Sequence, residues 1–284
     1  MKTGLVLEGG ALRTIFSSGV CDALLEGGVG VDYVVGVSAG IAYGVSYVSR
    51  QPRRNLELVT RYAADRRYMG VGNLLNPRNR SYFGLDFTFR RIPEELLPFD
   101  YDTFAAYPGE MEAVVTDLAT GQAHYLPVPR DAAGSSLVLQ ASCALPLMFP
   151  IYRLDGSDYL DGGVADAIPY ERALALGCDR VVVVLTRPRD FMRKPDTALK
   201  LVEWKYRKYP AFCAAMRSRA RRYNECRKRL FEKERQGEIL VIAPENTRGV
   251  SRTERDGEKL RLLWSDGYKM GMERLDELRA YLRG

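Results

Sequence analysis

The chain contains a single histidine, His124, among its 284 residues. A serine hydroxyl is a weak nucleophile near neutral pH and usually passes its proton to an imidazole as it attacks. Serine catalysis in this chain must therefore use His124 or replace imidazole with another base. The obvious replacement is a carboxylate.

Other scarcities exclude further classes of protein. The cysteines are odd in number, scattered and never in a C-x-x-C pair, which argues against a disulfide framework and against a zinc site; they are Cys21, Cys143, Cys178, Cys213 and Cys226. No apolar run approaches the roughly 18 residues of a membrane span. Too few apolar residues precede Glu8 to form a signal sequence. We expect a cytoplasmic protein with reduced thiols and no bound metal.

Positive charge is concentrated in residues 187–235, which hold 17 Lys and Arg against 6 Asp and Glu. That local excess is larger than the net charge of +6 for the whole chain, so the remainder is acidic. Such a run is either the solvated face of surface helices or a patch that binds anions. No nucleic-acid recognition motif accompanies it, and we expect no nucleic-acid partner.

The order of predicted elements indicates an α/β fold. Two strand–helix units open the chain, and a β-hairpin follows at residues 110–116 and 123–128. The strands of the opening units are at 5–7 and 32–35 and their helices at 14–25 and 41–50; later helices are expected at 135–144, 169–176, 197–209, 211–235 and 254–282, and later strands at 159–160, 181–185 and 238–243. We predict one domain, 1–284, with a variable insertion at about 51–108 and a basic helical region at about 187–235.

The segment Gly36-Val37-Ser38-Ala39-Gly40 is the first chemical motif. It lies between a predicted strand and a predicted helix, where glycines permit a tight turn that exposes the serine above the sheet edge, as in a nucleophile elbow. A glycine-rich turn with a helix-capping serine is the alternative.

Gly9-Gly10-Ala11-Leu12-Arg13 occupies the equivalent turn of the preceding unit. Its backbone is expected beside Ser38, where N–H groups of Gly10, Ala11 and Ala39 would hold an oxyanion. Arg13 either braces this loop and adds positive potential or is an ordinary surface arginine. A nucleotide site is disfavoured because the Rossmann spacing and the Walker lysine are both missing.

Asp161-Gly162-Gly163 supplies the candidate base, although an Asp-Gly turn is also a common loop element. A free aspartate is a weak base, so catalysis would need partial burial or favourable geometry. His124 is the alternative base. It lies in a predicted hairpin strand, and it precedes the acid, which is not the order of α/β-hydrolases.

These motifs together resemble the patatin-like phospholipase family over about residues 4–185, and Ala141-Ser142-Cys143-Ala144-Leu145-Pro146 is similar to that family's segment before the aspartate. The resemblance implies a three-layer α/β/α fold with a mostly parallel central sheet, Ser38 as nucleophile, Asp161 as base, and no metal or organic cofactor. It implies an oxyanion hole of Gly9, Gly10, Ala11 and Ala39, with Arg13, Gly36, Gly40, Gly162 and Gly163 in support. Ala11 and Thr14 depart from the family loop, which usually has glycine at both positions.

We therefore expect a serine acyl hydrolase that cleaves carboxylic esters of lipids or phospholipids through a Ser-Asp dyad and an acyl-enzyme. Aromatic residues at 82–89 would line an acyl channel or simply pack in the core. Residues 187–235 would give peripheral contact with an anionic membrane surface. One rival hypothesis is an inactive module that binds lipid or protein on the same fold, and another is an enzyme for a different acyl donor, such as a thioester or peptide.

Overall fold

A computed structural model describes all residues, 1–284, and contains one eight-stranded sheet with helices on both faces. Hydrogen-bonded neighbours follow the path β5-β6-β3-β2-β1-β7-β8, and β4 (Ala123–Pro127) pairs with β3 outside that path. β1 (Thr3–Leu7), β2 (Tyr33–Val37), the first part of β3 (Glu110–Asp117), β7 (Arg180–Val184) and β8 (Ile239–Ile242) run parallel. β4, β5 (Tyr152–Leu154) and β6 (Ser157–Asp161) pair antiparallel. The predicted three-layer fold with a mostly parallel sheet is confirmed.

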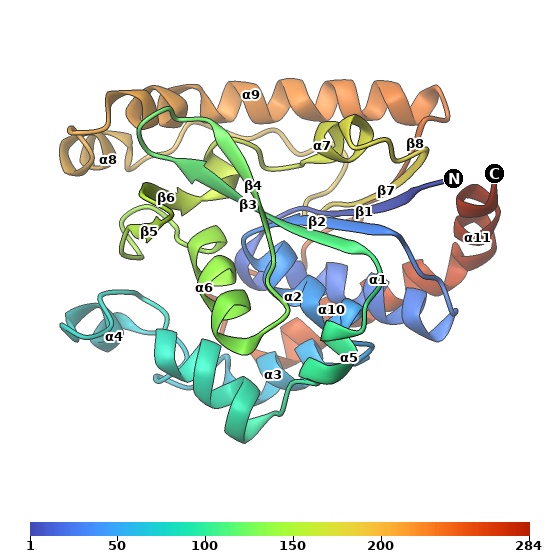
Figure 1. The fold of residues 1–284 in the computed structure, drawn as a ribbon, viewed down its shortest axis with the longest axis horizontal. Coiled ribbons are helices and arrows are strands. Elements are labelled where there is room, and N and C mark those ends of the chain that lie inside the picture. The colour runs from blue at the N-terminus through green and yellow to red at the C-terminus, as the bar shows by residue number, and fades with distance from the viewer.

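Alternation along the central strands creates a core on each face of the sheet. Leu5 and Leu7 point into a cluster with the helices of one face, whereas Val6 points into a cluster with the other. Figure 1 shows α9 (Pro210–Arg235) along one side of the sheet and α1 (Ile15–Glu26), α2 (Ala39–Val48) and α10 (Gly257–Glu273) along the other. Both clusters are buried, so the sheet is the middle layer.

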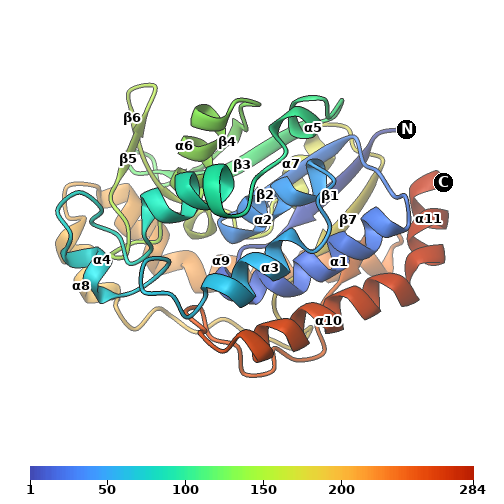
Figure 2. The same cartoon turned by 90° about the horizontal axis from the view of Figure 1, so that it is seen from below.

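On the face of the sheet that α1, α2 and α10 cover, α1 packs closely on α10, as seen from below in Figure 2. The predicted helix at 254–282 is in fact two helices, because α10 ends at Glu273 and α11 (Leu275–Arg283) starts after Arg274. The helix predicted at 197–209 is shorter, α8 (Leu199–Lys205). α7 (Tyr170–Ala175) packs near β7 on the other face. None of these helices combines the length and the apolar character that crossing a bilayer requires.

The insertion at 51–108 is mostly helical. It contains α3 (Arg54–Tyr62), α4 (Val71–Leu75), a π-helix (Phe87–Leu96) and α5 (Tyr101–Ala105). The π-helix contains Pro93, whose lack of an N–H disfavours regular α-helical bonding there. α3, the π-helix and α5, together with α6 (Ala132–Ser142), surround the cavity at the carboxyl end of β2, where the predicted elbow lies.

Candidate active site

Ser38 lies in a strained turn between β2 and α2. Its φ of 55° and ψ of −131° are unfavourable for a residue with a Cβ. Only 8% of the residue is exposed. The backbone N–H of Ser38 donates to Oγ of Ser142 at 2.9 Å, and that hydroxyl donates to the carbonyl of Val114 at 2.7 Å. A buried serine from α6 thus holds the turn to β3, a role that the sequence motifs did not reveal.

The glycines of the motifs permit close backbone contacts around this turn. A Cβ at Gly9 would lie 2.7 Å from the carbonyl oxygen of Val37, and one at Gly40 would lie 2.4 Å from that of Leu7. Gly36 and Gly162 are similarly confined, with Cβ positions 2.8 Å from Ile41 N and 2.2 Å from Val114 O. Side chains at these positions would force apart the segments that form the site.

Ser38 and Asp161 meet because β2 and β6 lie end to end along one edge of β3. Val37 pairs with Val114, and Asp161 pairs with the next residue, Val115. β4 overlaps both stretches of β3 in register and therefore occupies the opposite edge. The two strands approach from opposite directions, so the carboxyl end of each points at the other.

Asp161 is 2% exposed, and only one of its carboxyl oxygens is paired. Oδ1 accepts the N–H of Gly163 at 2.8 Å, while Oδ2 is buried without a hydrogen-bond partner. Burial raises the pKa of Asp161 above its ordinary value, although Arg219 and the Ser38 hydroxyl lower it in part. The Ser38 hydroxyl therefore lies near the carboxyl group without a well-formed hydrogen bond, a geometry common before substrate binds. The raised pKa makes Asp161 a stronger base than a free aspartate.

The glycine loop after β1 lies against the Ser38 turn. The backbone N–H groups of Gly9 and Gly10 have no protein acceptor, and those of Ala11 and Ala39 open helices, where N–H groups lack intrahelical partners. Ala11 has a φ of 50°, in the left-handed region that favours glycine. Ala11 therefore holds a backbone conformation that glycine would adopt with less strain.

Glu8 anchors this loop, which sequence reasoning also missed. Its buried carboxylate accepts the N–H of Thr186 at 2.6 Å and the hydroxyl of Tyr223 at 2.5 Å. Thr186 also donates to the carbonyl of Gly9 at 3.2 Å. Of the two interpretations of Arg13, the ordinary surface arginine is excluded, since the residue is only 7% exposed.

His124 contacts another side chain and not Ser38. It lies on β4 opposite Val115, and its Nδ1 is 3.0 Å from the hydroxyl of Tyr159. It lines neither of the two cavities that reach Ser38. The geometry therefore offers Ser38 a carboxylate neighbour and no imidazole.

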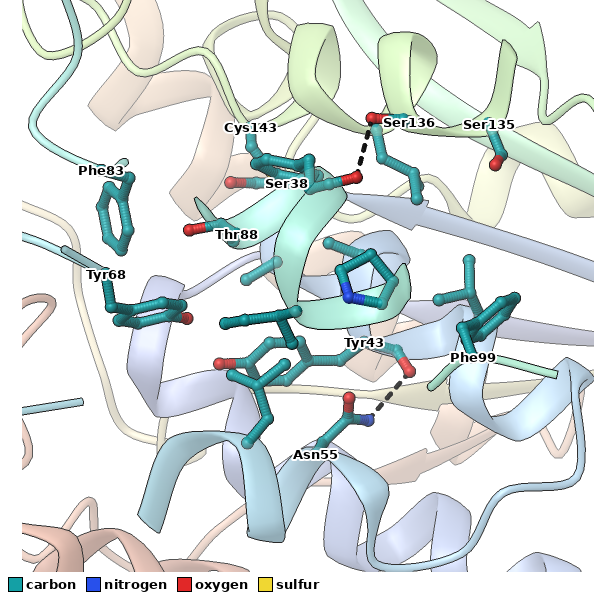
Figure 3. Close-up of a pocket in the computed structure, with 18 of the residues that line it drawn as sticks. Ser38, Tyr43, Asn55, Tyr68, Phe83, Thr88, Phe99, Ser135, Ser136 and Cys143 are labelled. Carbon is teal, nitrogen blue, oxygen red and sulfur yellow. Dashed lines mark hydrogen bonds between the residues drawn. The ribbon is translucent and has the colours of Figure 1, made fainter. Parts of the chain in front are cut away.

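The first cavity beside Ser38, with a volume of about 130 Å³, is apolar: 18 of its 25 lining residues are hydrophobic. Nearly half of its wall comes from the insertion, including Phe83 and Phe89. Figure 3 shows Phe83 and Tyr68 on one side of this cavity and Phe99 on the other. Tyr82 and Phe87, in contrast, do not line it. The insertion thus forms an apolar chamber next to the serine.

Comparison with known proteins gives two family matches. A family model described as patatin-like phospholipase matches residues 5–174, and a model for a domain of unknown function, DUF6363, matches residues 209–283.

The individual relatives are less than 30% identical to this chain. An uncharacterized protein of Escherichia coli strain K12, YjjU, is 29% identical over 220 residues, which cover 72% of this chain and 57% of YjjU. A lysophospholipase of Aspergillus niger, nte1, is 26% identical over 193 residues, 64% of this chain and 12% of that protein. VipD from Legionella pneumophila, a solved structure, is 17% identical with a TM-score of 0.47 over 97% of this chain and 67% of VipD. The chain thus spans little more than half of YjjU and a small part of nte1.

Proposed function

Because the chain belongs to the patatin-like phospholipase family, we propose that it is a serine acyl hydrolase that cleaves carboxylic esters of lipids or phospholipids. The observation that carries this proposal is the end-to-end meeting of β2 and β6, which brings Ser38 beside Asp161. An apolar chamber and unpaired backbone N–H groups lie at the same point.

In the proposed reaction, Oγ of Ser38 attacks the ester carbonyl carbon and passes its proton to Oδ2 of Asp161. N–H groups of Gly9, Gly10, Ala11 and Ala39 stabilise the negative charge on the carbonyl oxygen, an effect worth about 3 kcal/mol for each donor. The C–O bond breaks, and Asp161 returns the proton to the leaving alcohol. A water molecule then attacks the acyl-enzyme with Asp161 as base and regenerates Ser38.

Labelling with a fluorophosphonate probe tests the nucleophile directly. The wild-type protein should react and hydrolyse p-nitrophenyl esters, whereas Ser38→Ala should do neither. Ser136→Ala is the matched control, because Ser136 lines the same cavity but donates to the carbonyl of Phe89. Labelling that persists in Ser38→Ala would refute the assignment.

A module that binds lipid without turnover is the second candidate. The left-handed alanine in the oxyanion loop favours it, because a displaced Ala11 amide would weaken stabilisation of the charged intermediate. A wild-type protein that binds lipid but does not react with the fluorophosphonate would support this candidate.

We also propose peripheral membrane contact through α8 rather than through the basic helix α9. Much of the charge of α9 is neutralised by ion pairs, such as Arg221 with Glu225 and Arg229 with Glu171. α8 instead exposes Leu201 and Trp204, 53% and 65% accessible, beside the exposed lysines Lys200, Lys205 and Lys208. An aromatic and an aliphatic side chain flanked by lysines suit the surface of an anionic bilayer.

The chain is further proposed to form a single domain. The segments matched by the two family models share one sheet, since β8 pairs with β7 and β7 with β1.

A further inference from the structure

A second cavity reaches Ser38 from the other side, and its chemistry differs from that of the apolar chamber. It has a volume of about 310 Å³, and only 7 of its 21 lining residues are hydrophobic. Ser38, Ala11 and Leu145 line both cavities, whereas Asp161 lines only the second. The reactive serine therefore stands at the boundary between an apolar space and a polar one.

Six cationic side chains line the second cavity: Arg13, Arg187, Arg193, Lys194, Arg219 and Arg252. Its three acids do not offset them. Asp196 lies 3.8 Å from Arg193 and 3.4 Å from Arg219. Glu8 already accepts hydrogen bonds from Thr186 and Tyr223. Asp161 faces Ser38. Arg13, Arg187, Lys194 and Arg252 have no carboxylate partner.

The buried guanidinium of Arg13 shows that this charge is unsatisfied. Its Nε has no hydrogen-bond partner, although the residue is more than nine-tenths buried. Burial, together with repulsion from Arg187 and Arg252, lowers the pKa of Arg13 to about 10. A cluster of like charges that repel one another attracts an anion, and arginine forks match the oxygens of a phosphate group.

The position of Asp161 identifies which part of a substrate enters this cavity. The base must return its proton to the oxygen of the leaving alcohol, so the alcohol must lie on the side that Asp161 lines. The geometry points to a binding site for a phosphate group on the leaving alcohol, with the acyl chain in the apolar chamber. This inference rests on the proposed hydrolase function and adds to it a preference for acyl esters whose alcohol carries a negatively charged phosphate.

Five of the six cationic residues lie outside the patatin-like match, and Arg13 is the one inside it. Arg187, Arg193 and Lys194 follow β7, and Arg252 precedes α10, whereas the patatin-like match ends at residue 174. The charge of the cavity is thus supplied mainly by parts of the chain that the patatin-like family model does not match.

Kinetics on monomeric substrates test the inference without a membrane surface. Below the critical micelle concentration, kcat/KM for a 1-acyl glycerol phosphate should exceed that for the monoacylglycerol of the same chain at least about tenfold. Arg187→Gln and Arg252→Gln should each reduce this ratio several-fold. Arg261→Gln is the matched control, since Arg261 is exposed on α10 and lines neither cavity. A ratio near one, or a ratio that both pocket variants leave unchanged, would overturn the inference.

Binding measurements separate this inference from the hydrolase proposal. In Ser38→Ala, an ether-linked alkyl glycerol phosphate should bind more tightly than the alkyl glycerol, and Arg252→Gln should remove most of the difference. If the wild type hydrolyses no ester but this preference persists, the hydrolase proposal fails and the anion site stands. If esters are cleaved without charge preference, only the anion site fails. Inorganic phosphate that displaces the alkyl glycerol phosphate supports a site for the phosphate itself; displacement only by glycerol-linked phosphate supports a headgroup site.

Discussion

The backbone N–H of Ser38 donates to the hydroxyl of Ser142, 104 residues further along the chain, at 2.9 Å. Ser142 in turn donates to Val114, so one fully buried hydroxyl joins the elbow, α6 and β3. This link explains how a strained turn keeps one conformation.

Ser142→Ala should therefore reduce both stability and activity. It leaves a buried N–H and a buried carbonyl without partners, which costs about 1–3 kcal/mol of the free energy of unfolding. We expect esterase activity to fall about tenfold as Ser38 loses its position. Ser17→Ala is the control for loss of a buried hydroxyl, because Ser17 Oγ has no hydrogen-bond partner. Urea denaturation and p-nitrophenyl ester hydrolysis measure the two effects, and equal stability of both variants would contradict the role of Ser142.

Strain at Ser38 predicts that glycine is more stable there than alanine. Both Ser38→Gly and Ser38→Ala should be inactive. Because glycine accepts the positive φ, the free energy of unfolding of Ser38→Gly should exceed that of Ser38→Ala by about 1 kcal/mol. In α2, Ser46→Gly should instead be about 1 kcal/mol less stable than Ser46→Ala, because a helix interior disfavours glycine. Thermal unfolding of the four variants distinguishes strain from a general effect of glycine.

Asp161 predicts a characteristic dependence on pH. Its pKa is raised in the folded protein, so the folded state retains a proton that the unfolded chain loses near pH 4. The free energy of unfolding should fall as pH rises from about 4 through the raised pKa, and Asp161→Asn should be more stable than wild type at pH 7. Activity should decrease on acidification through the same pKa and should drop by about two to four orders of magnitude in Asp161→Asn.

Asp32→Asn is the control, because its effect on stability at pH 7 should have the opposite sign to that of Asp161→Asn. Asp32 accepts hydrogen bonds from the N–H and hydroxyl of Thr3, which lower its pKa. Its stabilising effect is present above the ordinary aspartate pKa and is lost on acidification, so Asp32→Asn should be less stable than wild type at pH 7. Denaturation curves across this pH range compare the variants.

A fully active Asp161→Asn would refute the proposed base.

Contact with membranes should depend on the tip of α8. Replacing Leu201 and Trp204 by serine should reduce cosedimentation with anionic vesicles several-fold, and high salt should weaken binding of the wild type. Leu262→Ser, at an exposed leucine on α10, is the control for a lost surface apolar group. Binding that is insensitive to lipid charge and to the α8 substitutions would exclude this surface.

Much of the fold was predictable from local patterns. Gly36 and Gly40 around Ser38 predicted a strand–turn–helix, and the apolar run at 181–185 predicted a buried strand, because alternation and glycine placement act over a few residues. The insertion was not resolved into helices from sequence, since aromatic side chains that pack against α2 and α6 stabilise it. The break at Arg274 between α10 and α11 was also missed.

The sequence by itself determined which reactive and charged groups the protein contains: one histidine, a serine in a glycine turn, an aspartate before two glycines, and a basic segment far along the chain. Only the tertiary structure decided which of these groups meet. Asp161 reaches Ser38 because two strands end head to head on β3, His124 is turned toward Tyr159, and Arg252 joins Arg13 in one cavity. Such distant contacts depend on sheet register and packing, which no short segment of sequence encodes alone.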